Sequence, residues 1–313
     1  MRTLLLCAAL ISSPVHAQEF PTRAPIEITV LFPAGSSADV TARMLADGVS
    51  KQLNQRVLVV NRPGAGGAIG YKHVAIQKAD GYSLVWNSNS ISTSYHAGQL
   101  AFDYTAFEPV ARVLVESVVL AVRADAKWKT LADLVADAKA RPKEISIGHS
   151  GAGSHTHLSL AALTHAAGIE ANEVPFAVAQ VVPSLIGGHV DAIVQFPGAL
   201  AAPLKQGQAR LLVQLTTARD PAFAEVPTAR ELGVDVALDA WRGVAAPKGT
   251  PTAVIATLEH AIRVTTESEE FAKGSANLAV RPGFLPAKEF GELIAKDDAS
   301  IAQLMQQIGL KKN

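Results

Sequence analysis

The sequence predicts an α/β protein made of two α/β units followed by a helical tail. Short apolar segments with the two-residue period of strands alternate with segments at helical spacing, and this alternation begins twice, at Ile26 and near Val118. In each unit a Gly/Ser-rich loop runs from a strand into a helix, and these loops are Phe32–Asp39 and Gly148–His155. Such alternation implies parallel strands joined by right-handed crossovers.

The first unit begins with a strand over residues 26–32, where apolar and polar side chains alternate. Apolar residues at helical spacing from Val40 to Leu53 predict the helix that follows. The next expected elements are a strand at Arg56–Asn61, a helix near Ala68–Lys78 and a strand at Tyr82–Asn87.

The second unit repeats this pattern. Its first helix should begin after Thr130, because Thr130 and Asp133 have the spacing of a capping box. The expected strands are Val118–Arg123, Ile145–Gly148, Val174–Phe176, Val190–Gln195 and Leu211–Thr216; the expected helices are Leu131–Ala140 and His157–Gly168, with short helices between the later strands. Beyond Trp241 we expect one more strand and then helices near Thr252–Thr266 and Pro286–Ile308.

The N-terminus has the three parts of an export signal: a positive start at Met1–Thr3, an apolar core at Leu4–Ile11 and a small-x-small pattern at Val15–Ala17. We therefore expect cleavage after Ala17, giving an exported mature protein. No later segment reaches the roughly 18–20 uninterrupted apolar residues of a membrane helix. The single cysteine, Cys7, lies within the signal, which excludes disulfides and thiolate chemistry from the mature chain.

The composition describes a compact globular protein that is long enough for two domains. Of the 313 residues, 49% are apolar and 18% are charged, which excludes a disordered chain. Lysine plus arginine balance aspartate plus glutamate at 28 each, so we expect no nucleic-acid partner. The low aromatic content of 5% also disfavours a stacking platform for bases or sugars.

The two loops have the composition of anion-binding sites. Gly35 permits a tight turn, and Ser36 and Ser37 can cap the next helix or donate hydroxyls to a ligand. Asp39 is either an acceptor in the pocket or a helix cap. The second loop repeats the pattern with Ser150, Gly151, Gly153 and Ser154. Because small side chains leave backbone N–H groups free at the positive end of a helix, the two loops predict a clamp on a carboxylate.

Three histidines near the second loop, His149, His155 and His157, permit a metal-site interpretation. No cysteine or close carboxylate completes the set, so we expect no metal ion and, instead, one histidine that lines the pocket as a hydrogen-bond donor.

Two further motifs suggest enzymes. Arg62–Gly70 is similar to a dinucleotide-binding loop, but its glycine spacing is wrong and it follows the second strand. Gly148–Ala152 is similar to the nucleophile elbow of a hydrolase, although Ala152 stands where the second glycine belongs. Since Asp191 and His260 follow in the order of a catalytic triad, a secreted α/β serine esterase using Ser150 is the alternative to a binding protein.

A series of short motifs, in fixed order along the mature chain, resembles the substrate-binding proteins of tripartite tricarboxylate transporters, also called Bug-type receptors. The motifs are Phe32–Arg43, Asn61–Gly70, Asp80-Gly81-Tyr82, Ser150-Gly151-x-Gly153-Ser154 with His157-Leu158, Gly187-Gly188-x-Val190-Asp191, Val226-Pro227-Thr228 with Glu231-x-Gly233, Trp241-x-Gly243 and Ala246-Pro247-x-Gly249-Thr250-Pro251.

The resemblance implies a two-lobed periplasmic-binding-protein architecture (type II, Venus-flytrap) with crossing hinge strands. Lobe 1 would comprise residues 18–112 and 241–313, and lobe 2 residues 113–240. The protein would be a periplasmic receptor and no enzyme, would need no cofactor or metal, and would pass its ligand to the cognate membrane permease subunits. We expect a monomer.

By the same resemblance, the ligand is a small carboxylate held by backbone amides and hydroxyls in the cleft between the lobes. The candidate ligand-binding residues are Ala34, Gly35, Ser36, Ser37, Asp39, Ser88 and Asn89 in lobe 1, and Ser150, Gly153, Ser154 and His155 in lobe 2.

The chain departs from the common family pattern at three places. Ser36-Ser37 stands where glycines are common, Pro175–Val178 where Pro-Tyr-Lys-Gly is common, and Gln195-Phe196 where an Asp-Asn or Phe-Asp type pair is more usual. Phe176 and Phe196 complete the candidate ligand-binding residues; with Gln195 they would lie near the cleft and make it more apolar, unless both phenylalanines are core residues. We therefore expect a carboxylate with an apolar or aromatic body.

Overall fold

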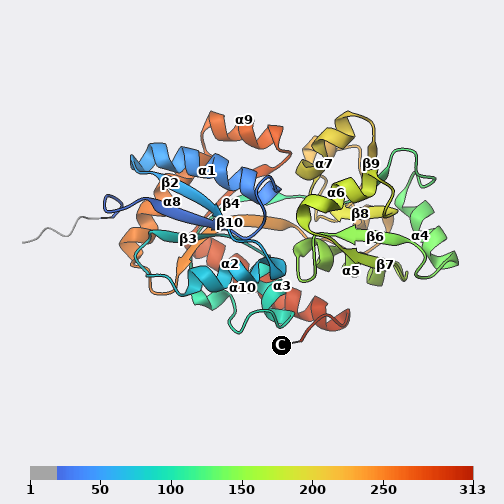
Figure 1. Ribbon diagram of the computed structural model, residues 1–313, viewed down its shortest axis with the longest axis horizontal. Helices are drawn as coiled ribbons and strands as arrows, with labels where there is room; N and C mark the ends of the chain where they lie inside the picture. Colours follow the sequence, from blue (N-terminus) through green and yellow to red (C-terminus); the bar gives the residue numbers. More distant parts are fainter. Residues whose placement is uncertain (1–19, 313) are drawn as a thin grey trace, which may run out of the picture.

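The computed structural model describes residues 20–312 and divides them into two lobes, each with its own β-sheet (Figure 1). The sheet of lobe 1 has the strand order β11-β4-β10-β3-β1-β2, and the sheet of lobe 2 has the order β7-β6-β8-β5-β9. The predicted signal peptide and Cys7 lie outside the described residues. No helix among the described residues is long and apolar enough to cross a membrane.

Lobe 1 takes its elements from both ends of the chain. Its strands are β1 (Ile26–Val30), β2 (Val57–Asn61), β3 (Ser83–Ser88), β4 (Phe107–Glu116), β10 (Ala240–Pro247) and β11 (Arg281–Pro286). Its helices are α1 (Ser37–Leu53), α2 (Ala68–Ala75), α3 (Ser90–His96), α8 (Thr252–Thr266), α9 (Glu269–Asn277) and α10 (Ala287–Gln307), with 3₁₀ turns η1 (Ala65–Gly67) and η2 (Tyr104–Ala106).

Lobe 2 is formed by the middle of the chain. Its strands are β5 (Val119–Arg123), β6 (Ser146–His149), β7 (Asn172–Pro175), β8 (Ala192–Gln195) and β9 (Ala209–Gln214). Its helices are α4 (Leu131–Ala140), α5 (His155–Ala167), α6 (Val178–Ile186) and α7 (Pro197–Lys205), with 3₁₀ turns η3 (Pro221–Phe223) and η4 (Arg230–Leu232).

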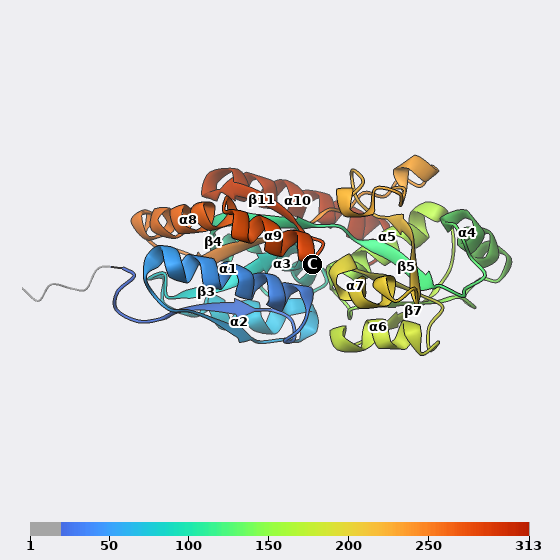
Figure 2. The same ribbon diagram turned by 90° about the horizontal axis from the view of Figure 1, so that it is seen from above.

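Each sheet is covered by helices on both faces, as Figures 1 and 2 show. In lobe 1, α1, α8 and α9 pack on one face around Leu45 and Ile262, and α2 and α3 pack on the other around Tyr71 and Ile91. In lobe 2, α4 and α5 cover one face, and α6 and α7 the other. Burying a leucine or isoleucine of this kind stabilises the fold by about 1.5–3 kcal/mol per side chain.

The chain crosses between the lobes through strands that lie side by side. β4 ends at Glu116 in the first sheet and β5 begins at Val119 in the second. The return passes from Leu238 into β10, which pairs antiparallel with β4 so that Ala240 lies opposite Glu116. This pairing brings residues more than a hundred positions apart to the floor between the lobes. The end of α10 also contacts lobe 2, through a cluster of Leu158, Ile301 and Met305.

Most predicted elements are present within a few residues of the expected bounds. The capping box is confirmed, because the Thr130 side chain accepts from the Asp133 amide while the Asp133 carboxylate accepts from the Thr130 amide. Parallel pairing holds for β1 with β2 and β3 and for β6 with β7 and β8. The parallel pairing expected from the strand–helix alternation is thus confirmed for these strands, whereas β10 runs antiparallel to β3 and β4, and β5 runs antiparallel to β8 and β9. These strands enter their sheets from the opposite lobe, so no crossover helix sets their direction.

Four elements, β4, β11, α3 and α9, had no predicted counterpart. Strand β4 carries Pro109 and three charged residues, and α3 has the sequence SISTSYH, so neither has a regular hydrophobic period. Their structure is imposed by the neighbouring strands and the core.

Candidate functional site

A cleft of about 520 Å³, part of it open to solvent, lies between the two lobes. Both lobes and the crossing strands contribute to its wall. The lining residues are Phe32, Ser36, Ser37, Ala38, Ser88, Asn89, Ser90, Ser150, Ser154, His155, Thr156, Val178, Gln195, Phe196, Ala199, Ala240, Trp241 and Arg242. The lining combines hydroxyl groups with aromatic rings, which is typical of small-molecule sites.

The first turns of two long helices, one in each lobe, border this cleft. Ser37 and Ala38 begin α1, and His155 and Thr156 begin α5. Within residues 20–312 the backbone N–H groups of these four residues donate to no acceptor. Unpaired amides at the positive end of a helix dipole favour an anion, and here they are supplied from two sides of one cavity.

In lobe 1, Asp39 does not line the cleft; its side chain instead forms hydrogen bonds that hold the Phe32–Asp39 loop. Its carboxylate accepts from the backbone N–H of Gly35 at 2.9 Å and from Asn61 Nδ2 at 2.9 Å, and it pairs with Arg43 at 2.9 Å. Burial acts to raise the pKa of Asp39, but the hydrogen bonds from Arg43, Gly35 and Asn61 outweigh it and hold that pKa below its usual value. Asp39 therefore stays ionised and fixes the turn that presents Ser36 and Ser37.

In lobe 2, a network of hydroxyls holds the corresponding loop. Ser154 Oγ caps α5 by accepting from the His157 amide at 3.2 Å. Thr156 Oγ1 accepts from the Ser150 amide at 3.0 Å, and Gln195 Nε2 donates to Ser150 Oγ at 3.1 Å. Because these partners come from β8 and α5, the loop is held from two elements at once.

The floor of the cleft contains a buried ion pair between Arg242 of β10 and Glu116 of β4. Arg242 Nε donates to Glu116 Oε2, and Ser37 Oγ donates to Glu116 Oε1. The guanidinium also lies over the rings of Phe196, at 5.2 Å, and Phe32, at 5.9 Å. Arg242 is not among the predicted ligand-binding residues, because Arg242 occupies the variable position of the Trp241-x-Gly243 motif.

Beside the cleft, lobe 1 and lobe 2 touch directly. Thr93 Oγ1 donates to the carbonyl oxygen of Gly153 at 2.6 Å, and Gln99 Nε2 donates to that of Ala152 at 3.3 Å. Gly153 has φ +76°, and a Cβ atom there would lie 2.8 Å from Gln99. Gly66 approaches the same segment, since a Cβ on it would lie 3.1 Å from the Ala152 oxygen. These glycines are positions where the two lobes come together closely.

Eight of the thirteen predicted ligand-binding residues line the cleft: Ser36, Ser37, Ser88, Asn89, Ser150, Ser154, His155 and Phe196. Five do not line it: Ala34, Gly35, Asp39, Gly153 and Phe176. Of the two phenylalanines, Phe176 packs against the core of lobe 2 and lies close to Gly148, whereas Phe196 faces the cleft.

His155 is the histidine that lines the cleft. Its Nε2 lies 3.2 Å from the carbonyl oxygen of Leu238, and its ring stacks on Phe196 at 6.5 Å. Burial lowers the pKa of His155 to about 4. The ring is therefore neutral at pH 7 and brings no charge to the cleft.

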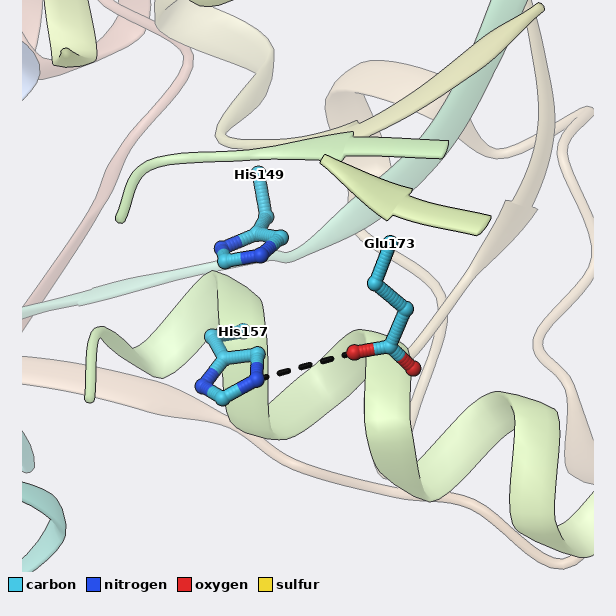
Figure 3. A group of neighbouring side chains, drawn as sticks. All are labelled: His149, His157 and Glu173. Atoms are coloured by element: carbon cyan, nitrogen blue, oxygen red, sulfur yellow. Dashed lines mark ion pairs between the residues drawn. The ribbon is translucent and has the colours of Figure 1, made fainter. Parts of the chain in front are cut away.

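His149, His157 and Glu173 gather outside the cleft, on β6, α5 and β7 (Figure 3). Their ligand atoms lie within 4.8 Å of one another. The expectation that no carboxylate lies close to these histidines is wrong, because the pairing of β7 with β6 places Glu173 opposite Ile147. The Gly153 amide donates to His157 Nδ1 at 3.2 Å, so a neutral His157 carries its proton on Nε2, which lies 3.6 Å from the Glu173 carboxylate. A protonated Nε2 is a donor and not a metal ligand, so this arrangement favours a His–Glu pair.

The residues of the hypothetical esterase triad have other partners. Gln195 donates to Ser150 Oγ, Asp191 accepts from the backbone and hydroxyl of Ser146 at 2.8 and 2.7 Å, and His260 contacts Arg263 on α8 of lobe 1. Among the described residues, then, Ser150 has no histidine as a hydrogen-bonded base.

The comparisons with known proteins agree with this geometry. Residues 41–310 match the model of the family described as "Tripartite tricarboxylate transporter family receptor". Protein BugT of Bordetella pertussis is 32% identical over 314 residues, covering 98% of this chain and 96% of its own. The solved periplasmic binding protein BugD has a TM-score of 0.85 and 26% identity, with 93% of this chain and 99% of that chain covered. An R. palustris protein solved with adipate has a TM-score of 0.87 and 26% identity over the same shares.

The order of motifs, the two-lobed fold and the cleft between the lobes thus coincide with one family over nearly the whole chain. The chain belongs to the tripartite tricarboxylate transporter receptors, as a Bug-type solute-binding protein.

Proposed function

We propose that this chain captures a small carboxylate with an apolar or aromatic body in the periplasm and delivers it to the membrane permease of a tripartite tricarboxylate-type transporter. The observation that carries the proposal is the pair of unpaired helix N-termini, Ser37–Ala38 and His155–Thr156, at one cleft. Both sets of amides border the space in which a carboxylate would bind. Charge-assisted hydrogen bonds of this type contribute roughly 1.5–3 kcal/mol each.

The apolar body is supported by the side chains around these amides. Phe32, Phe196 and Trp241 line the cleft together with Val178 and Ala199. A ligand that is polar throughout would leave these surfaces without matching contacts, whereas an alkyl or aryl group is stabilised by about 25 cal/mol for each Å² it buries. The adipate found in the R. palustris relative has such an alkyl segment between its carboxylates.

Capture would work by closure of the two lobes. A ligand that contacts both lobes stabilises the closed form over an open one, and the closed form would present a joint surface of both lobes to the permease. We propose the lobe division 18–112 with 241–313 and 113–240, where residues 113–116 carry β4 from lobe 1 into the crossing. We also propose export with cleavage after Ala17, and a monomeric receptor.

The proposal is tested by a thermal-shift screen of the protein purified from the periplasm. The panel contains hexanoate, benzoate, adipate, malate and citrate, with hexanamide, glucose and glutamine as neutral or zwitterionic controls. A ligand at a hundred times its Kd stabilises the folded state by about 2.7 kcal/mol, which gives a clear shift in Tm. We expect hexanoate, benzoate or adipate to give the largest shift. The proposed class is wrong if only the neutral or zwitterionic controls shift Tm, and the apolar body is wrong if malate or citrate gives the largest shift.

A further inference from the structure

The Arg242 guanidinium is only partly satisfied by the protein. Within residues 20–312, its one hydrogen bond runs from Nε to Glu116, and Nη1 and Nη2 donate to no acceptor. Arg242 is 4% exposed and lines the cleft. Nη1 and Nη2 still reach solvent in the cleft, where a ligand can accept hydrogen bonds from them.

Arg242 is also the one formally charged side chain among the residues that line the cleft. Glu116 is 1% exposed and lies behind Arg242, and Asp39 is occupied by Arg43 and Asn61. Since His155 is neutral at pH 7, the lining presents a single positive group and no negative one. That balance is complementary to an anionic group on the ligand.

The neighbours of Arg242 hold its guanidinium in one orientation. Glu116 fixes the Nε edge, and Ser37 holds the second oxygen of Glu116. Phe196 and Phe32 lie near the guanidinium at 5.2 and 5.9 Å, within reach of cation–π attraction. With Nε taken, the two terminal nitrogens remain as a fork, the geometry that binds both oxygens of a carboxylate.

We propose that Arg242 is the specificity-determining residue of the cleft and holds the ligand carboxylate through Nη1 and Nη2, with Glu116 and Ser37 as positioning residues. This inference rests on the proposed function, because it assigns one side chain to the anion that the helix N-termini also favour. It adds a charged donor to the neutral backbone amides, so that Arg242 strengthens the selection of a carboxylate over its neutral, equally shaped amide.

The test compares a carboxylate with its amide in matched variants. Hexanoate with hexanamide and benzoate with benzamide are measured by isothermal titration calorimetry on the wild type, Arg242→Gln and Arg242→Lys. Arg242→Gln destabilises the fold because it leaves Glu116 buried without its partner. The double variant Glu116→Gln/Arg242→Gln avoids this cost, because it removes both charges together. The control is Arg281→Gln, because Arg281 lies at the other side of the crossing strands and lines no part of the cleft.

We expect the wild type and Arg281→Gln to prefer the carboxylate strongly. Loss of a charge-assisted bond of about 1.5–3 kcal/mol predicts that the preference falls roughly 10- to 100-fold in Arg242→Gln and in the double variant. Arg242→Lys keeps the charge but loses the fork, so its preference for the carboxylate should lie between those of the wild type and Arg242→Gln. If the wild type prefers carboxylates and the double variant keeps that preference, the role of Arg242 is wrong and the proposed function stands. If the wild type binds hexanamide or benzamide as tightly as the acids, the proposed function fails as well.

Discussion

The hydroxyl of Thr93 donates a 2.6 Å hydrogen bond to the carbonyl oxygen of Gly153, and this bond joins lobe 1 to lobe 2 beside the ligand cleft. Thr93 is 1% exposed and lies on α3, whereas Gly153 belongs to the loop before α5. The contact therefore forms only when α3 of lobe 1 and the loop before α5 of lobe 2 lie together.

Thr93→Val removes this donor with little change of shape and leaves the Gly153 carbonyl oxygen without a partner in the closed form. An unsatisfied buried acceptor costs about 1–2 kcal/mol, so the Kd of the best ligand should rise roughly 5- to 30-fold. Calorimetric titration measures this. The control is Thr257→Val on α8, where the hydroxyl bonds only within its own helix. Equal Kd values in the two variants would show that the Thr93–Gly153 bond does not contribute to closure.

Gly153→Ala should block closure as well as strain the backbone. Its φ of +76° disfavours a Cβ atom, and that atom would lie 2.8 Å from Gln99 of lobe 1. Gly168→Ala is the matched control. Gly168 also has a positive φ, +61°, and lies at the C-terminal end of α5, but nothing lies within 4 Å of its Cβ position. Both variants should lose about 1 kcal/mol of stability in urea unfolding. Only Gly153→Ala should also weaken ligand binding, and comparable binding by both would contradict the close approach of the lobes.

The two serine caps at the cleft should contribute to both stability and binding. Ser36 Oγ accepts from the Asp39 amide at 3.3 Å, and Ser154 Oγ from the His157 amide at 3.2 Å. Ser36→Ala and Ser154→Ala should each lower the free energy of unfolding by about 1 kcal/mol. Ser268 caps α9 in the same way at 3.2 Å but lies outside the cleft. We expect Ser268→Ala to lose similar stability and to keep the wild-type Kd.

His149 should make the protein less stable in mild acid. Burial, and secondly the nearby His157, lower the pKa of His149 to about 4, against 6.5 for an ordinary histidine. As the pH falls from about 6.5 to about 4, the unfolded chain takes up a proton at this position and the folded chain does not, so the free energy of unfolding decreases. His149→Gln should reduce the loss between pH 7 and pH 5 by about 1–2 kcal/mol. Urea titrations of this variant and of the exposed control His165→Gln measure the difference, and equal losses in both would refute the assignment.

Ester hydrolysis should not depend on Ser150. Its hydroxyl accepts from Gln195 and has no histidine base in the described chain. We expect the wild type and Ser150→Ala to hydrolyse p-nitrophenyl acetate at the same slow background rate. A wild-type rate well above background that disappears in Ser150→Ala would revive the esterase hypothesis.

The local parts of this protein could be predicted from the sequence. The helix caps Thr130, Ser36 and Ser154, the glycine turns and most strands depend on residues within a few positions of one another, and such interactions leave a pattern in the chain. For the same reason, the two Gly/Ser-rich loops at the helix N-termini could be located without the structure, and eight of the thirteen candidate residues line the cleft. The motif order also carried the family resemblance, which the comparisons confirm.

The remaining features depend on contacts between distant segments. Arg242 meets Glu116 across 126 positions because β10 and β4 pair at the crossing between the lobes. Glu173 reaches His157 because β7 pairs with β6, and Thr93 reaches Gly153 because the two lobes come together. No periodicity or spacing encodes these partners, since their closeness results from strand pairing and burial over the whole chain. The sequence by itself determined a two-unit α/β receptor with two Gly/Ser-rich loops at helix N-termini. Only the tertiary structure decided that a buried arginine lies between them.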